Sequence, residues 1–142
     1  MWNEIVNNAD VKNFMETVSG FHDSCIKEIK YVSGAYVDDR HFMYPVNNKR
    51  KLSIIIQRQT SINSTIELEF RKLKHLKLIP LDETYTCEIL DSTLLLHEGF
   101  FYWCDCGGLT INKILLYEGT VVCAEALRWR SINDKGQGGR FA

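Results

Sequence analysis

The hydrophobic positions near the N-terminus recur with the period of an amphipathic helix. Between residues 10 and 18, apolar side chains follow at i, i+3, i+4 and i+7, the spacing that places them on one helical face. These residues are Val11, Phe14, Met15 and Val18. Asp10 can cap the free amides at the start, and Ser19-Gly20 ends the pattern. The spacing predicts a helix over 10–18 whose apolar face requires a partner surface.

Further along the chain, apolar and polar residues alternate with the period of two that is typical of β-strands. The segments 51–59 and 66–71 show it most clearly and predict a hairpin. Strand composition also covers 25–37, 86–96 and 100–103, with a phase slip near Asp91-Ser92 that predicts a bulge. The segments 111–117 and 120–129 predict a last hairpin.

The intervening segments show weaker patterns. Residues 38–50 contain Pro45 and the run Asn47-Asn48-Lys49-Arg50, and they predict a loop. Residues 73–81 carry apolar side chains at every second or third place and end near Pro80, so a helical turn and an irregular edge segment both stay open. The glycine-rich residues 133–142 predict a flexible C-terminal tail.

The order of these elements predicts the fold class. One helical unit followed by about six or seven mostly antiparallel strands predicts an α+β fold, with the N-terminal helix packed on one face of a curved sheet. Because the predicted hairpins are sequential, a meander is favoured over a parallel topology. We expect residues 1–132 to form a single α+β domain.

Composition and charge narrow the classes of function. Hydrophobic residues make up 45% and charged residues 25% of the 142 residues, which is typical of globular proteins. Lys and Arg number 17 against 18 Asp and Glu, so the chain lacks the positive field of a non-specific nucleic-acid or anionic-membrane binder. No apolar block has signal-peptide or membrane-spanning length, and we expect a cytoplasmic location without membrane contact.

Catalytic candidates lie at the predicted junction of helix and first strand. His22, Asp23 and Cys25 could form a small metal-dependent or Cys/His hydrolase site, because His-Asp pairs bind metals and a Cys near a base can act as a nucleophile. The junction favours a structural role, in which Asp23 accepts backbone amides in an Asx-turn and His22 hydrogen-bonds across the joint. Burial as a small hydrophobic residue is favoured for Cys25.

A metal fragment is the next candidate. Cys104 and Cys106 precede a Gly-Gly turn and could bind zinc, with His97 or His22 completing a tetrahedral set. The single residue between them argues against zinc, because structural sites usually have about two to four intervening residues and a second matched pair. We therefore predict no cofactor, and Cys104, Cys106 and His97 are the candidates should a metal bind.

Aromatic and arginine residues in the last third of the chain predict a binding surface. They are the residue types that dominate protein interfaces, namely Tyr102, Trp103, Arg128, Trp129 and Arg130. Core packing is the competing interpretation for most of them. Base stacking is disfavoured, because no basic residues are interleaved with the aromatic run at 100–103.

The first half of the chain carries a family resemblance. The helix followed by Phe21-His22-Asp23-Ser24-x-Ile26, with the strands at 52–56 and 66–70, resembles small, largely uncharacterised bacterial proteins that include some polymorphic-toxin immunity proteins. In those proteins a His-Asp pair opens the first strand of an α+β sheet domain. The resemblance implies a cytoplasmic, non-enzymatic protein that covers a partner, and it brings no catalytic residues.

The leading functional expectation is therefore a protein-binding module such as a toxin-immunity protein. Two alternatives stay open. One is the small hydrolase built on His22, Asp23 and Cys25. The other is a small-ligand binder that uses the concave side of the sheet, since curved sheets offer such pockets.

Overall fold

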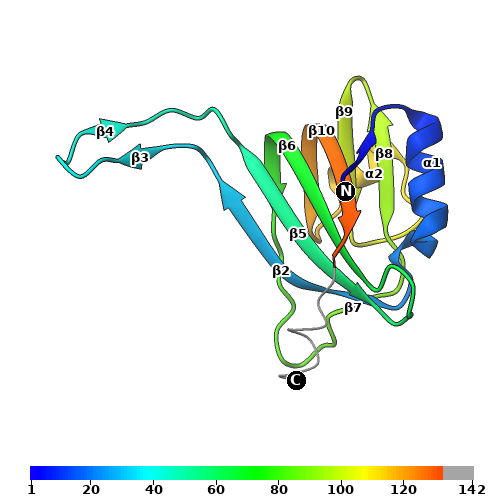
Figure 1. The fold of residues 1–142 in the computed structure, drawn as a ribbon. Helices are drawn as coiled ribbons and strands as arrows, with labels where there is room; N and C mark the ends of the chain where they lie inside the picture. Colours follow the sequence, from blue (N-terminus) through cyan, green and yellow to red (C-terminus); the bar gives the residue numbers. More distant parts are fainter. Residues whose placement is uncertain (133–142) are drawn as a thin grey trace.

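A curled antiparallel sheet dominates the computed structural model, which describes residues 1–132. Seven strands follow one another across a half-barrel (Figure 1). Their spatial order is β7 (Glu88–Ile89), β2 (Ser24–Val32), β5 (Lys51–Arg58), β6 (Thr65–Lys77), β10 (Val121–Ser131), β9 (Phe100–Cys104) and β8 (Thr93–His97). An eighth strand, β1 (Asn3–Ile5), pairs with β10. The predicted α+β class with a mostly antiparallel sheet is confirmed.

The hairpin of β5 and β6 shows how the alternating pattern builds the sheet. Three cross-strand pairs point into the core, namely Leu52 with Phe70, Ile54 with Leu68, and Ile56 with Ile66. The residues between them, including Ser53 and Glu67, lie on the outer face, where the Ser53 hydroxyl donates to Glu67 at 2.7 Å. Because side chains in a strand alternate between faces, one sequence supplies both surfaces. The predicted hairpin is confirmed.

The helix α1 (Asn8–Thr17) begins after two residues that follow β1. Asn7 caps it, because its side chain accepts from the Asp10 amide at 2.9 Å; the prediction that Asp10 is the cap is wrong. Asp10 instead accepts from the Val6 amide. Phe14 of α1 lies 5.0 Å from Trp129 and 5.7 Å from Phe21 between ring centroids.

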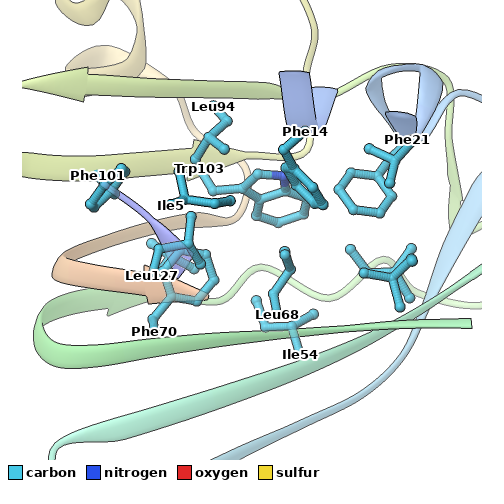
Figure 2. Close-up of a cluster of buried hydrophobic side chains, with 14 of the residues drawn as sticks. Ile5, Phe14, Phe21, Ile54, Leu68, Phe70, Leu94, Phe101, Trp103 and Leu127 are labelled. Atoms are coloured by element: carbon cyan, nitrogen blue, oxygen red, sulfur yellow. The ribbon is translucent and has the colours of Figure 1, made fainter. Parts of the chain in front are cut away.

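The core lies inside the curl of the sheet, and Figure 2 shows its centre. Trp103 of β9 is fully buried there, beside Phe14 and with Leu68 and Ile54 of the central strands nearby. Phe21 comes from the short 3-10 turn Ser19–Phe21, which connects α1 to β2. Within residues 1–132, no helix combines the length and the apolarity needed to cross a bilayer.

Two predicted strand segments are wrong. Residues 111–117 form the helix α2 (Ile111–Leu116), so the predicted last hairpin does not exist. A short apolar run does not distinguish strand from helix, and here only Ile114 is buried while Leu116 is 82% exposed. β10 instead lies between β6 and β9, which interrupts the predicted meander.

The segment 86–96 is also not one bulged strand. It divides into β7 and β8, which lie at opposite ends of the sheet order, because the chain leaves the sheet between Ile89 and Thr93. The ambiguous residues 73–81 are resolved in part, since β6 continues to Lys77. The predicted tail at 133–142 lies outside the described residues.

The predicted loop at 38–50 contains one strand of a small two-stranded sheet, and the other strand directly precedes the loop. The strands β3 (Tyr36–Val37) and β4 (Met43–Tyr44) pair with each other and with no strand of the main sheet. Figure 1 shows this hairpin extending far from the body beyond the ends of β2 and β5. We call residues 33–50 the arm.

Candidate binding arm and sheet edge

The arm carries a dense set of exposed apolar side chains. Met43 is 69% exposed and Phe42 58% exposed at its tip. The full set of large apolar residues exposed on the arm is Tyr36, Val37, Phe42, Met43, Tyr44 and Val46. Single exposed apolar residues are common on proteins, whereas contiguous groups mark interaction sites. The arm is therefore the first candidate for a binding element.

Local hydrogen bonds fix the tip of the arm. The Asp38 carboxylate accepts from the backbone amides of Arg40 at 2.9 Å and Phe42 at 3.0 Å, and the Asp38 amide donates to the Phe42 carbonyl at 2.9 Å. These bonds, the one from Phe42 first, lower the pKa of Asp38. Tyr36 and Tyr44 are directly opposite across β3 and β4, and their rings stack with centroids 4.8 Å apart. The tip is thus a defined turn with an aromatic face.

Backbone hydrogen bonds also close the base of the arm. The Ser33 carbonyl accepts from the amides of Lys49 at 3.0 Å and Arg50 at 3.2 Å, which closes the two sides of the arm. Gly34 has a φ of +103°, and a Cβ at this position would lie 2.1 Å from Asn48 Oδ1. Gly34 is favoured here for two reasons. Other residues rarely adopt this φ, and their Cβ would collide with the Asn48 side chain. These contacts close the base of the arm where it leaves β2 and β5.

The outer edge of β2 adjoins the arm. β7 pairs with β2 only at Ser24 and Cys25, and beyond them no described strand pairs with this edge. Lys27, Glu28 and Lys30 are exposed along it. An unpaired edge presents free backbone donors and acceptors and is a template for another strand. Edge and arm thus form one continuous candidate surface.

The predicted binding residues lie on two different faces. On the outer face, Arg128 Nε lies 2.7 Å from Glu69 Oε1, and Arg130 is 2.8 Å from Glu67 Oε1. Trp2 stacks on both guanidinium groups, at 4.2 Å from Arg128 and 4.3 Å from Arg130. Both arginines are therefore engaged within the chain, and Trp2 is a residue that sequence reasoning missed.

The three predicted aromatic binding residues lie inward or partly covered. Trp103 has no exposed surface and cannot contact a partner while the core is intact. Trp129 is packed against Phe14, on the face of β10 opposite the two arginines. Tyr102 is half-buried and lies opposite Cys123. The structure therefore does not bring the five predicted residues together as one surface.

His22 and Asp23 form a joint between two segments. His22 Nδ1 lies 2.5 Å from the Leu90 carbonyl, and its Nε2 lies 3.2 Å from Asp23 Oδ2. The carbonyl contact first, and then the charge of Asp23, raise the pKa of His22. An imidazolium ring can donate from both nitrogens to these two acceptors. The pair therefore connects the start of β2 to the segment between β7 and β8.

Two of the candidate cysteines, Cys25 and Cys104, have raised pKa values. Burial, and then the neighbouring Cys87, raise the pKa of the Cys25 thiol, which opposes the thiolate form that a nucleophile needs. Burial also raises the pKa of Cys104, whose thiol donates to the Cys106 carbonyl at 3.3 Å. His97 instead lies 3.4 Å from Glu98. Across residues 1–132, no three His, Cys, Asp or Glu side chains are grouped so that they could hold a metal.

A cleft lies between β7 and the turn that follows α2. It has a volume of about 940 Å³ and is lined by Glu88, Asp91, Asp105 and Glu118 among others, with no Lys or Arg among its described lining residues. The Tyr117 hydroxyl donates to Asp105 at 2.7 Å, and burial with this bond raises the pKa of Tyr117. The cleft is therefore acidic and suits the small-ligand alternative only for a cationic ligand.

Comparison of the chain with protein-family models, with curated proteins and with solved structures gave no match. The resemblance to immunity proteins therefore stays a prediction.

Proposed function

We propose that this protein is a non-enzymatic protein-binding module whose binding element is the arm. The observation that carries the proposal is the group of exposed apolar side chains on a hairpin that projects from the body (Figure 1). Aromatic residues and Met are enriched at the centres of protein interfaces. A projecting hairpin can insert such residues into a partner without any change in the sheet.

The preformed geometry of the arm supports this role. A two-stranded hairpin on its own is marginally stable in water, yet here the Asp38 turn, the Tyr36–Tyr44 stack and the Ser33 carbonyl bonds hold its shape. Binding by a preordered element loses less conformational entropy than binding by a flexible loop. The arm therefore presents its apolar side chains at little ordering cost.

The magnitude of the binding contribution follows from burial. Covering an exposed Phe or Met side chain stabilises a complex by about 1.5–3 kcal/mol each. Phe42 and Met43 are consecutive at the tip and both exposed, so a partner that encloses the hairpin can bury both as anchors. The resemblance to immunity proteins makes a toxin the first partner class to test. No catalytic group is needed for such a function.

Photo-crosslinking in the producing cells tests the proposal. A benzophenone amino acid in place of Met43 is expected to give a discrete protein adduct. The matched control carries the same amino acid in place of Leu116, which is 82% exposed on α2 and far from the arm in sequence. Adducts that form at both positions, or at neither, contradict the arm as the binding element.

The adduct identifies a partner whose affinity can then be measured. With purified partner, the Phe42→Ala, Met43→Ala double variant is expected to bind at least about tenfold more weakly, because burial of two large side chains is lost. A Leu115→Ala, Leu116→Ala variant on α2 is the control and should bind as the wild type does. Equal affinities for both variants contradict the proposal.

A further inference from the structure

The free edge of β2 has a charge pattern that is complementary to itself. Glu28 and Lys30 pair with Ile55 and Ser53 of β5, so both side chains lie on the outer face of the sheet, one on either side of Ile29. The ion pairs within residues 1–132 engage neither of them. Their charges are therefore available to a strand that adds to this edge.

An antiparallel copy of the same edge satisfies both charges at once. If two β2 strands pair about a two-fold axis at Ile29, Glu28 of each copy lies opposite Lys30 of the other. Opposite charges across a strand pair are stabilising and like charges are destabilising. A shift of two residues in either direction places Glu28 opposite Glu28 or Lys30 opposite Lys30. A shift of one copy's β2 by one residue turns the inward-facing apolar side chains of that strand to the outer face. The charges thus select one register.

We propose that the partner of this surface is a second copy of the chain, joined through antiparallel pairing of the two β2 edges about Ile29. This inference rests on the proposed function and names its partner. The pairing is isologous, so it closes into a dimer and leaves the β2 edge of neither copy free. The formal net charge of −1 offers little long-range repulsion between the copies.

The same arrangement directs each arm towards the other copy. In the proposed register, Val32, after which the arm starts, lies opposite Ile26, near the beginning of β2 in the second copy. Exposed apolar residues lie near that beginning, at Leu78, Ile79 and Leu81. With Ile26 and Ile29 of β2 they line a groove of about 220 Å³, whose rim also includes Glu88 and Asp105. A groove of this size receives one or two of the apolar side chains of an arm.

Arm and groove cannot meet within one molecule, since the arm extends away from the body (Figure 1). In a pair of copies, the arm of each copy can meet the groove of the other. The dimer therefore covers apolar surface that each single copy leaves in water.

Sedimentation velocity of the purified full chain over a concentration series tests the inference. The wild type is expected to form a dimer, and the single charge reversals Glu28→Lys and Lys30→Glu are each expected to raise its dissociation constant at least about tenfold. The double variant Glu28→Lys, Lys30→Glu restores opposite charges across the pair and is expected to return close to the wild-type constant.

Two controls separate edge pairing from other causes. Lys113→Glu makes the same charge change on α2, away from the edge, and should leave the dissociation constant unchanged. Thermal melting of each variant confirms that it is folded; since both edge side chains are exposed, the core is not touched. A wild-type monomer throughout the series, or single reversals that the double variant does not rescue, would overturn the inference.

The failure of this inference is distinguishable from failure of the proposed function. A monomeric wild type that still gives arm-specific adducts with another protein overturns the second copy and leaves the arm as the binding element. A dimer that responds to the charge swap but is unchanged by Phe42→Ala, Met43→Ala supports edge pairing and overturns the role of the arm. Loss of the dimer in the single charge reversals and also in Phe42→Ala, Met43→Ala supports both the edge pairing and the role of the arm.

Discussion

Two aromatic segments of this chain have opposite surroundings. In β9, Phe101 is 3% exposed and Trp103 is fully buried, whereas on the arm Tyr36 is 57% and Phe42 58% exposed. Both segments have apolar residues in extended backbone. The difference is coverage, because β9 has a strand on each side and the core beneath it, while the arm strands pair only with each other. Aromatic content alone therefore does not distinguish core from binding surface; the number of neighbouring elements does.

The largest expected effect comes from substitution in the core segment. Trp103→Ala is expected to lower the free energy of unfolding by about 3–5 kcal/mol, since it leaves a large cavity. Phe42→Ala on the arm should change it by less than about 0.5 kcal/mol in the unbound protein, because no core contact is lost. Urea denaturation at low protein concentration measures both. Similar losses in the two variants would mean that the arm contributes to the core.

The outer face provides the next effect. Arg128→Ala removes the 2.7 Å partner of Glu69, a carboxylate that is only 4% exposed. We expect a loss of about 2 kcal/mol, because a buried charge loses its main counter-charge. Arg130→Ala, whose partner Glu67 is less deeply buried, should cost about 1 kcal/mol. Chemical denaturation of the two variants measures their free energies of unfolding. A larger loss of stability for Arg130→Ala than for Arg128→Ala contradicts the prediction.

A smaller effect is expected at the base of the arm. Gly34→Ala forces a Cβ into the space of Asn48 at a positive φ and should loosen the arm locally by about 1 kcal/mol, roughly a fivefold loss of amide protection. Hydrogen exchange at the Lys49 and Arg50 amides, which bond to the Ser33 carbonyl, reports it. Amides of the β5–β6 hairpin serve as the control. Unchanged exchange at the base would show that glycine is not required there.

The smallest effect is the pH dependence of the His22 joint. Because the folded state raises the pKa of His22, its contribution to stability is complete below the unfolded pKa of about 6.5 and is lost as pH rises through the folded pKa. The difference in melting temperature between wild type and His22→Gln should therefore be larger at acidic than at alkaline pH. A difference that does not vary with pH contradicts a charged His22 at this joint.

Local periodicity was sufficient for part of the fold. The β5–β6 hairpin follows from strict alternation, because each residue that turns inward has an apolar partner opposite. Helix α1 follows from the 3.6-residue spacing, within two residues at its start. The cap was assigned to Asp10 and not Asn7, since both residue types cap helices and the choice depends on where the backbone leaves the extended conformation.

The remaining features depend on contacts that periodicity does not contain. The helix at Ile111–Leu116 buries only Ile114, which packs with Cys104 of β9 and Val121 of β10. Trp2 stacks on Arg128 and Arg130, which lie at the opposite end of the sequence.

Residues 38–50 of the arm are predicted as a loop from Pro45 and the polar run, whereas residues 35–37 are predicted to continue the preceding strand. The signal that could have identified the arm is the aromatic pair Tyr36 and Tyr44 around the Asp38 turn. That signal predicts a hairpin but not its exposure, because exposure depends on where the main sheet ends. The candidate site was therefore missed, although every residue that forms it was visible in the sequence.

Hydroxyl-radical footprinting of the wild-type chain tests the central claim, that a partner covers the arm, most directly. Met43 on the arm and Met1 outside it are 69% and 98% exposed, and exposed methionines oxidise readily. In dilute purified protein both should be oxidised. At cellular concentration, in extract of the producing cells, we predict that Met43 becomes protected while Met1 does not. Equal oxidation of Met43 in both conditions, with Met1 unchanged, would contradict the account.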